Sequence, residues 1–342
     1  MKITKITNEI EWNKSIEVLA RPHILQSWGW GEFKSRWGWS PTRLLWRNEN
    51  NQPVAGAQLL RRGIPYTPFG IGYVSKGPLL DADDFMLAKK VLADIEAEAA
   101  RQRCLFVKID PDVLASNSAF VELLQQRGWL RGEPIQFSNT GVLDLRPDEQ
   151  ALLKAMKSKT RYNIRLSGRR GVEVKAGTPA QFEIFYQMYQ ETAERDGFLI
   201  RPRAYYLDVW HDFYAKGLAE LLIAWVEEVP VAGMVLFHFG ERVWYFYGAS
   251  TSLHRKHMPS YAVQWAAIQW GKANGATEYD FWGAPTNLDD PDDDMAGVWR
   301  FKTGFNAQFR HQIGAWDFPA LPMGYDMYTR WLPKAREMLA NR

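Results

Sequence analysis

The chain repeats one order of sequence features, and this repeat constrains its fold more than anything else in it. The tetrapeptide Pro-Val-Ala-Gly occurs at 53–56 and again at 230–233, in each case after a polar turn and before an apolar strand. A helix–strand pair is predicted further along each copy, over 89–110 and over 261–281. The spacing between the copies stays nearly constant, which chance matches of four letters seldom do. The sequence therefore predicts two copies of one mixed α/β (α+β) unit.

Length and composition agree with two folded domains. A chain of 342 residues is too long for one ordinary hydrophobic core. With 46% hydrophobic and 24% charged residues it is typical of a globular protein, and a net charge of +3 makes any strongly basic surface local. The single cysteine, Cys104, excludes a disulfide framework and a cysteine-based zinc site. Because no signal peptide and no apolar run long enough to span a membrane are evident, we expect a cytoplasmic protein.

Between Lys154 and Val172 the chain is strongly basic and, up to Glu173, has no acidic residue. A broken apolar stripe and Gly171 predict a basic helix that ends in a glycine cap. Such a run is often a solvated helix face. Its single sign of charge also suits an anionic partner, such as an RNA backbone or nucleotide phosphates. The cations are Lys154, Lys157, Lys159, Arg161, Arg165, Arg169 and Arg170.

The usual motifs of nucleophilic, metal and dinucleotide chemistry are missing from the sequence. It has no P-loop, no G-x-S-x-G elbow, no H-E-x-x-H and no G-x-G-x-x-G fingerprint. The acidic stretch 289–294 lacks regular ligand spacing and is interpreted as a solvated loop, so no metal and no cofactor are predicted. Lysine, arginine, tyrosine and aspartate residues near strand ends remain. They suit a transfer reaction on an already activated donor, run by positioning and charge stabilisation.

Five segments in a fixed order resemble the FemABX family, the aminoacyl-tRNA-dependent peptidyltransferases that build peptidoglycan interpeptide bridges. The resemblance extends from Trp28 to about Trp316 and implies two GNAT-like acyltransferase domains in tandem. There is no room for the coiled-coil helical arm of some members, so the chain is similar to the armless, FemX-type ones. The segments are SKTRYNIRLSGRRGV, YFYGAS, HRKHMPSYAVQW, YDFWG and RFKTGF.

The resemblance also implies a division of labour between the domains. Residues 1–145 with 316–342 would form the first GNAT-like domain and bind the acceptor. Residues 146–315 would form the second, on the aminoacyl-tRNA side. The acceptor implied is UDP-MurNAc-pentapeptide or lipid II, with peripheral membrane contact expected for the lipid-linked form and no role for DNA.

In the implied reaction, the amine of the third stem-peptide residue attacks the ester carbonyl of an aminoacyl-tRNA. The lysine of the pair Phe301-Lys302 would stabilise the negative carbonyl oxygen. Asp110 matches an aspartate that would bind or deprotonate the attacking ammonium, and Tyr247 would line the acceptor site.

Further residues match acceptor-binding positions of the family. Lys34 and Arg201 would bind the diphosphate of the acceptor, with Tyr205 close to Arg201 in sequence, and this match favours the soluble, UDP-linked form. Separately, we hypothesise that part of the basic stretch binds tRNA. The residues concerned are Lys157, Lys159, Arg161 and Arg165.

Rival interpretations remain open. A GNAT-like chain could use acetyl-CoA, but the expected glycine-rich phosphate loop is replaced by a segment over 255–260 that contains Met258 and Pro259. A non-catalytic RNA-binding protein would explain the basic stretch but gives no role to Asp110, Tyr247 and Lys302. A Leu/Phe-tRNA–protein transferase would share the chemistry and differ in its acceptor. The amino acid transferred is not readable from sequence, because pocket shape sets it.

Overall fold

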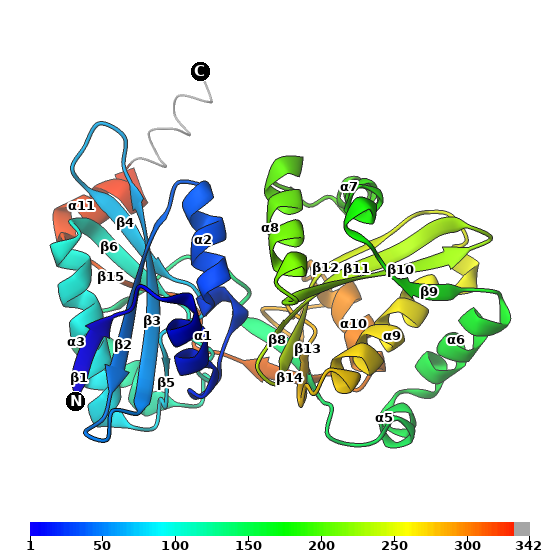
Figure 1. The fold of residues 1–342 in the computed structure, drawn as a ribbon, viewed down its shortest axis with the longest axis horizontal. Helices are drawn as coiled ribbons and strands as arrows, with labels where there is room; N and C mark the ends of the chain where they lie inside the picture. Colours follow the sequence, from blue (N-terminus) through cyan, green and yellow to red (C-terminus); the bar gives the residue numbers. More distant parts are fainter. Residues whose placement is uncertain (332–342) are drawn as a thin grey trace. The chain divides into compact units, whose positions relative to one another are not determined.

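The computed structural model describes residues 1–331, and the chain divides into two compact units (Figure 1). The first comprises Met1–Ser138 together with the chain from His311 onward, and the second comprises Asn139–Arg310. The predicted first domain included 332–342, which lie outside the described residues. No helix within the described chain is long and apolar enough to cross a membrane.

The first unit is a mixed sheet covered by helices. The sheet order is β1-β2-β3-β4-β6-β15-β7, and β5 pairs with β3. Only β4 and β6 run parallel, and every other pairing on this path is antiparallel. The strands are β1 (Lys2–Lys5), β2 (Ser40–Arg47), β3 (Pro53–Gly63), β4 (Gly70–Val74), β5 (Leu79–Leu80), β6 (Cys104–Ile109), β7 (Leu130–Arg131) and β15 (Trp316–Phe318). The helices are α1 (Glu9–Glu17), η1 (Ile24–Gln26), α2 (Trp28–Arg36), α3 (Phe85–Arg101), α4 (Ser118–Gln126), α11 (Pro322–Asp326) and η4 (Met327–Trp331).

The second unit has the same plan. Its sheet order is β14-β8-β13-β12-β11-β10-β9, and the parallel pair is β12 with β13. The strands are β8 (Asn139–Asp144), β9 (Glu173–Ala176), β10 (Ala219–Val226), β11 (Val229–Phe239), β12 (Arg242–Ser250), β13 (Glu278–Asp280) and β14 (Gln308–His311). The helices are α5 (Glu149–Ala155), α6 (Ser158–Arg169), η2 (Pro179–Gln181), α7 (Phe182–Asp196), α8 (Arg203–Ala215), η3 (Arg255–His257), α9 (Pro259–Ala273) and α10 (Ala296–Gly304).

The repeated Pro-Val-Ala-Gly segments open equivalent strands, β3 and β11. The glycine of each copy lies where a helix packs closely on the sheet. A Cβ atom on Gly56 would come within 3.1 Å of Ile16 on α1, and one on Gly233 within 3.0 Å of Phe185 on α7. The repeat is therefore a helix-on-sheet contact that both units use, and the predicted duplication is confirmed at the level of sheet order.

The two sheets exchange a strand. In the first sheet, the strand between β6 and β7 is β15, which comes from the end of the described chain. In the second sheet, the strand between β13 and β14 is β8, which follows the first unit in sequence (Figure 1). Because β8 pairs with β13, the compact second unit begins at Asn139, whereas the sequence-based boundary lies at residue 146.

The basic stretch differs from the single helix predicted for it. Lys154 belongs to α5, which ends before Met156, and α6 begins only at Ser158. Met156 and Lys157 are both extended and separate the two helices. The predicted glycine cap is confirmed, since Gly171 has a φ of +75° just past the end of α6.

Candidate active site

The lysine of the Phe301-Lys302 pair is buried in the second unit, on α10. Only 3% of Lys302 is exposed. Its Nζ donates a hydrogen bond to the carbonyl oxygen of Gly283 at 2.7 Å and another to that of Trp282. A buried ammonium needs such partners because its removal from water is unfavourable. It has three protons, so two carbonyls leave one for a further acceptor.

The loop after β13 orients these two carbonyl groups, and its backbone is strained. Trp282 and Gly283 have φ angles of +54° and +61°, in the left-handed region that tryptophan rarely adopts. The carboxylate of Asp280 accepts a hydrogen bond from the Trp282 backbone N–H at 2.9 Å and one from the hydroxyl of Thr140. Asp280 therefore fixes the loop, and the loop fixes Lys302.

Burial lowers the pKa of Lys302 from 10.5 to about 7, and the negative charge of Asp280 opposes this shift. Asp280 is itself buried and lies 3.5 Å from the guanidinium of Arg242. Lys302 can therefore gain or lose its proton near neutral pH. Such an ammonium can donate a hydrogen bond to an oxyanion that forms during acyl transfer.

Phe301 lines a pocket of about 430 Å³ within the second unit. β12 and β13 pair only as far as Trp244, and β12 continues beyond that point to Ser250. The pocket lies along this later part of β12, and residues of β11, α7, α9 and α10 complete its walls. The Phe301 ring is fixed by Tyr261, with the ring centroids 5.1 Å apart. The pocket gives this unit room for a small ligand group.

Tyr247, on β12, is enclosed by aromatic side chains of α8. Its ring centroid lies 5.6 Å from that of Tyr206 and 5.5 Å from that of Trp210. The guanidinium carbon of Arg201 lies 4.9 Å from the ring centroid of Tyr205. Burial raises the pKa of Tyr247, Tyr205 raises it further, and the charge of Arg201 opposes the shift. The structure thus brings three predicted residues together, Tyr247, Arg201 and Tyr205.

A series of contacts connects this aromatic group to Lys302. The rings of Tyr247 and Phe246 have centroids 6.2 Å apart, and those of Phe246 and Trp282 are 4.3 Å apart. The carbonyl of Trp282 accepts from Lys302. Tyr247 and Lys302 are therefore linked through two intervening aromatic residues, Phe246 and Trp282.

Asp110 directly follows β6 and is buried in the first unit. Its carboxylate accepts hydrogen bonds from the Tyr73 hydroxyl and from the Lys76 backbone N–H, both at 2.6 Å. The Lys76 ammonium is also buried and lies 3.5 Å from the carboxylate of Asp112. Burial raises the pKa of Asp110 to about 6, although the charge of Lys76 and both hydrogen bonds lower it. Such a carboxylate is ionised at neutral pH and can accept a proton from an amine.

Lys34 lies in the last turn of α2, beside tryptophan rings. Its Nζ is 5.5 Å from the ring centroid of Trp39, and the guanidinium carbon of Arg62 is 5.7 Å from the same centroid. Two cations at one indole favour an anionic ligand nearby. An ion pair that was not predicted from the sequence positions α2, since the buried Arg43 donates to the partly exposed Glu32 at 2.8 Å.

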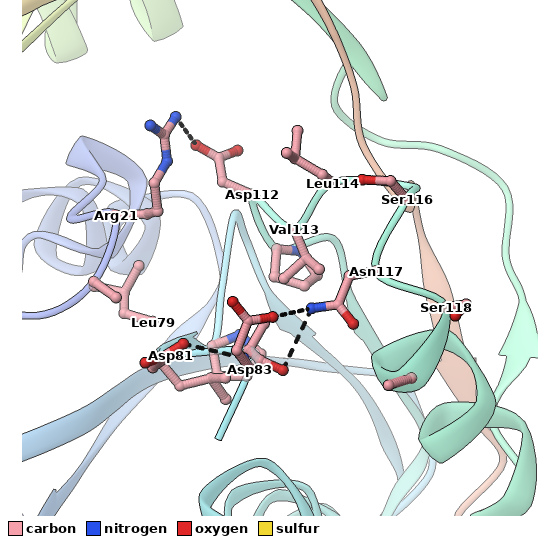
Figure 2. A pocket seen from close by; sticks show the side chains of 16 residues that line it. Arg21, Leu79, Asp81, Asp83, Asp112, Val113, Leu114, Ser116, Asn117 and Ser118 are labelled. Carbon is pink, nitrogen blue, oxygen red and sulfur yellow. Dashed lines mark hydrogen bonds and ion pairs between the residues drawn. The ribbon is translucent and has the colours of Figure 1, made fainter. Parts of the chain in front are cut away.

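The residues after Asp110 line a pocket of about 570 Å³ in the first unit, which contains both acidic and apolar side chains. Figure 2 shows Asp112 directed at Arg21, 3.8 Å away, and Asn117 at Asp83, 2.9 Å away. Asp110 itself does not line this pocket. Because its acidic side chains already have partners, the pocket adds no catalytic group to the predicted set. Within residues 1–331, no group of three or more His, Cys, Asp or Glu side chains is arranged to bind a metal ion.

The four cations of the tRNA hypothesis differ in their surroundings. Lys157 donates to the hydroxyl of Thr303 at 3.2 Å, beside Lys302 in sequence. Arg161 donates to the carbonyls of Lys154 and Met156, so it satisfies the end of α5. The other two, Lys159 and Arg165, are exposed on α6.

Two buried charged residues that contact predicted site residues were themselves not predicted, Lys76 in the first unit and Asp280 in the second. Lys76 lies just past the apolar strand that ends at Val74, and Asp280 lies in YDFWG, which carried the resemblance. A charged residue at the end of a predicted apolar strand was the available signal in both cases.

Solved structures match the whole fold. The crystal structure of FemX aligns with a TM-score of 0.87 at 22% identity, over 96% of this chain and 100% of the FemX chain. A tandem GNAT protein from the clavulanic acid biosynthesis pathway aligns with a TM-score of 0.54 at 12% identity, over 93% of this chain and 98% of its own. The chain is a tandem GNAT-like protein, as predicted. Its longest helix within the described residues is α3, of 17 residues, so no long helical arm is present there.

Sequence comparison then shows the family. The model of the FemAB family matches residues 11–227 and 220–331, and the chain belongs to this family of transferases. The lipid II:glycine glycyltransferase of Staphylococcus saprophyticus is 25% identical, over 91% of this chain and 91% of its own. That alignment spans 381 residues, more than the 342 residues of this chain, so the relative contains segments that have no counterpart here.

Proposed function

We propose that the chain transfers an amino acid from aminoacyl-tRNA to an amine of a peptidoglycan precursor, forming the peptide bond of an interpeptide bridge. The observation that carries this proposal is the buried Lys302, fixed by two carbonyls with one proton left for a further acceptor. Membership of the FemAB family and the likeness to a lipid II:glycine glycyltransferase support the class of donor and acceptor. Because tRNA is charged in the cytoplasm, we expect the enzyme to act there.

The proposed reaction needs no covalent enzyme intermediate. The acceptor amine, after losing a proton to Asp110, attacks the ester carbonyl carbon, so a C–N bond forms and the carbonyl oxygen becomes an oxyanion. Lys302 donates a hydrogen bond to that oxygen. Collapse of the intermediate breaks the C–O bond to the tRNA ribose. The attacking nitrogen loses its second proton in this step, and the ribose oxygen gains a proton as it leaves. Asp110 and Lys302 thus serve as base and oxyanion donor.

The direct test is transfer of labelled amino acids from a charged-tRNA pool to UDP-MurNAc-pentapeptide and, separately, to lipid II. We expect one acceptor to become labelled and RNase to abolish the labelling. Acetyl-CoA is included as a rival donor. RNase-resistant acetylation without amino-acid transfer would replace the proposal with a CoA-dependent one.

Replacing Lys34 or Arg201 by alanine is expected to raise the KM for the acceptor by about 10- to 100-fold and to change kcat little. The physical reason is that a diphosphate contact formed equally in the ground state and the transition state is uniform binding. Steady-state kinetics with varied acceptor measures this. The control is Lys89→Ala, which replaces an exposed lysine on α3. A fall in kcat at unchanged KM would contradict the assignment.

The tRNA hypothesis is tested best at the two exposed cations of α6. The double variant Lys159→Glu, Arg165→Glu is expected to weaken tRNA binding and to make its salt dependence shallower, by roughly one unit of log–log slope per lost phosphate contact. Filter binding at several salt concentrations measures both. The KM for the acceptor should stay unchanged. An unaltered salt slope would show that α6 does not contact the tRNA backbone.

A further inference from the structure

One end of the first unit carries a contiguous apolar surface that the proposed chemistry does not use. The tip of the β3–β4 hairpin and the segment through α11 and η4 form it together (Figure 1). Between them lies an apolar pocket of about 280 Å³. We call this surface the hairpin patch. It comprises Ile64, Tyr66, Phe69, Leu321, Met323 and Met327.

The hairpin patch exposes large apolar side chains to an unusual degree. Tyr66 is fully exposed, and Met323 is 83% and Met327 53% exposed. Single exposed apolar residues are ordinary on protein surfaces. A cluster around an apolar pocket is different, because such patches mark sites that bind another apolar surface.

The patch is presented on a rigid base. In the hairpin, the Ile64 N–H donates to the Phe69 carbonyl at 2.9 Å, and the hydroxyl of Thr67 donates to the Ile64 carbonyl at 3.0 Å. Beneath the patch, the buried side chains of Leu105 and Tyr325 form a small apolar cluster with the partly buried Ile64 and Phe69. The backbone that carries the exposed side chains is therefore held in place.

The rim of the patch is cationic. The segments that build it, residues 61–70, 103–105 and 319–328, contain Arg61, Arg62 and Arg103 but only one acidic residue, Asp326. Arg62 and Arg103 are exposed, and Arg61 donates to the Pro68 carbonyl at 3.2 Å, at the base of the hairpin tip. An apolar centre with an aromatic tip and a basic rim complements the interface of an anionic bilayer.

We propose that the hairpin patch docks the first unit on an anionic phospholipid bilayer. Tyr66 and Met323 enter the headgroup–acyl boundary, and the rim arginines contact lipid phosphates. The link to function rests on the proposed activity. Arg62 shares the indole of Trp39 with Lys34, so docking brings the diphosphate-binding lysine to the depth of the lipid headgroups. A lipid-linked acceptor carries its diphosphate at that depth, and docking therefore favours the lipid-linked form over the soluble one.

The test is co-sedimentation of the full chain with vesicles of phosphatidylcholine, with and without phosphatidylglycerol. We expect binding to the anionic vesicles that weakens with salt. Tyr66→Asp and Met323→Asp should each reduce it about tenfold, since a buried apolar contact becomes a charge. The matched control is Met86→Asp, because Met86 is 72% exposed on α3 and lies outside the patch. It should bind as the wild type does.

Three outcomes would overturn the proposal. The first is that the wild-type chain binds neither vesicle type, and the second is that Met323→Asp and Met86→Asp bind the vesicles equally. The third is that the wild type is a dimer that Met323→Asp dissociates, which would mean that a second copy of the chain covers the patch. The vesicle assay uses neither tRNA nor acceptor. Vesicle binding without amino-acid transfer would therefore contradict only the proposed function. Transfer to UDP-MurNAc-pentapeptide without vesicle binding would contradict only the proposed docking.

Discussion

Replacing Lys302 by methionine is expected to slow amino-acid transfer by about 10²- to 10³-fold, the usual effect of removing one oxyanion donor. Methionine fills a similar volume and cannot donate a hydrogen bond. The KM values for both substrates should change little, because the oxyanion exists only in the transition state. Single-turnover transfer at saturating substrates measures the rate. Arg300→Met, an exposed cation change on the same helix, is the matched control.

The same variant should unfold at nearly the wild-type temperature. The folded state lowers the pKa of Lys302, so between about pH 7 and 10.5 the unfolded chain binds more protons and stability rises with pH. At pH 7 the buried ammonium therefore opposes folding, and methionine removes that cost. Methionine also leaves the carbonyls of Trp282 and Gly283 without their donor. The two effects oppose each other, so a slow but stable variant identifies a functional lysine.

The pH dependence of transfer distinguishes the effect of the Lys302 charge from the effect of its side-chain shape. If the protonated form acts, wild-type transfer should fall as pH rises through about 7, where Lys302 loses its proton. Lys302→Arg keeps a permanent charge. It should transfer more slowly than the wild type, because the guanidinium fits the site poorly, but without this alkaline decline. A decline that persists in Lys302→Arg would assign it to another group.

How far the sequence predicted the fold depended on whether a feature was local. The duplication was visible because Gly56 and Gly233 must both lack a side chain where a helix meets the sheet. The exchange of β8 and β15 between sheets was not visible, since strand order is set by pairings between residues far apart in the chain. For the same reason the sequence-based domain boundary lies in the connection after β8, whereas the compact second unit begins at Asn139.

Burial of charge was the other feature that the sequence did not reveal. The sequence does not show whether a lysine is solvated or, like Lys76, only 3% exposed, because its burial depends on the residues that pack around it in the fold. Asp280 acts on Lys302 through a backbone loop, and no spacing rule describes such a contact. The break between α5 and α6 is similar, because Lys157 donates its backbone N–H to Gly304, far along the chain.

Replacing Asp110 by asparagine is expected to reduce transfer by about 10²- to 10⁴-fold, the range typical of a lost general base. Asparagine can preserve the local geometry. Its oxygen can accept from the Lys76 N–H, and its amide can donate to the Tyr73 oxygen. It cannot take a proton from the acceptor ammonium. Because the wild-type carboxylate has a pKa of about 6, its transfer rate should rise with pH through about 6, and the variant should lack this rise.

Stability and a neighbouring variant exclude a structural explanation. Burial raises the pKa of Asp110 above its unfolded value, so stability falls as pH rises from about 4 to 6 and the charge is unfavourable at pH 7. Asp110→Asn should therefore unfold no earlier than wild type at pH 7. Asp112→Asn is the contrast, because it weakens the ion pair with Lys76. It should lower the unfolding temperature. Its transfer rate should still rise with pH, as in the wild type, and this acid limb of the pH profile should move to lower pH because Asp112 raises the pKa of Asp110. An Asp110→Asn enzyme that still shows the acid limb would mean that another group deprotonates the acceptor.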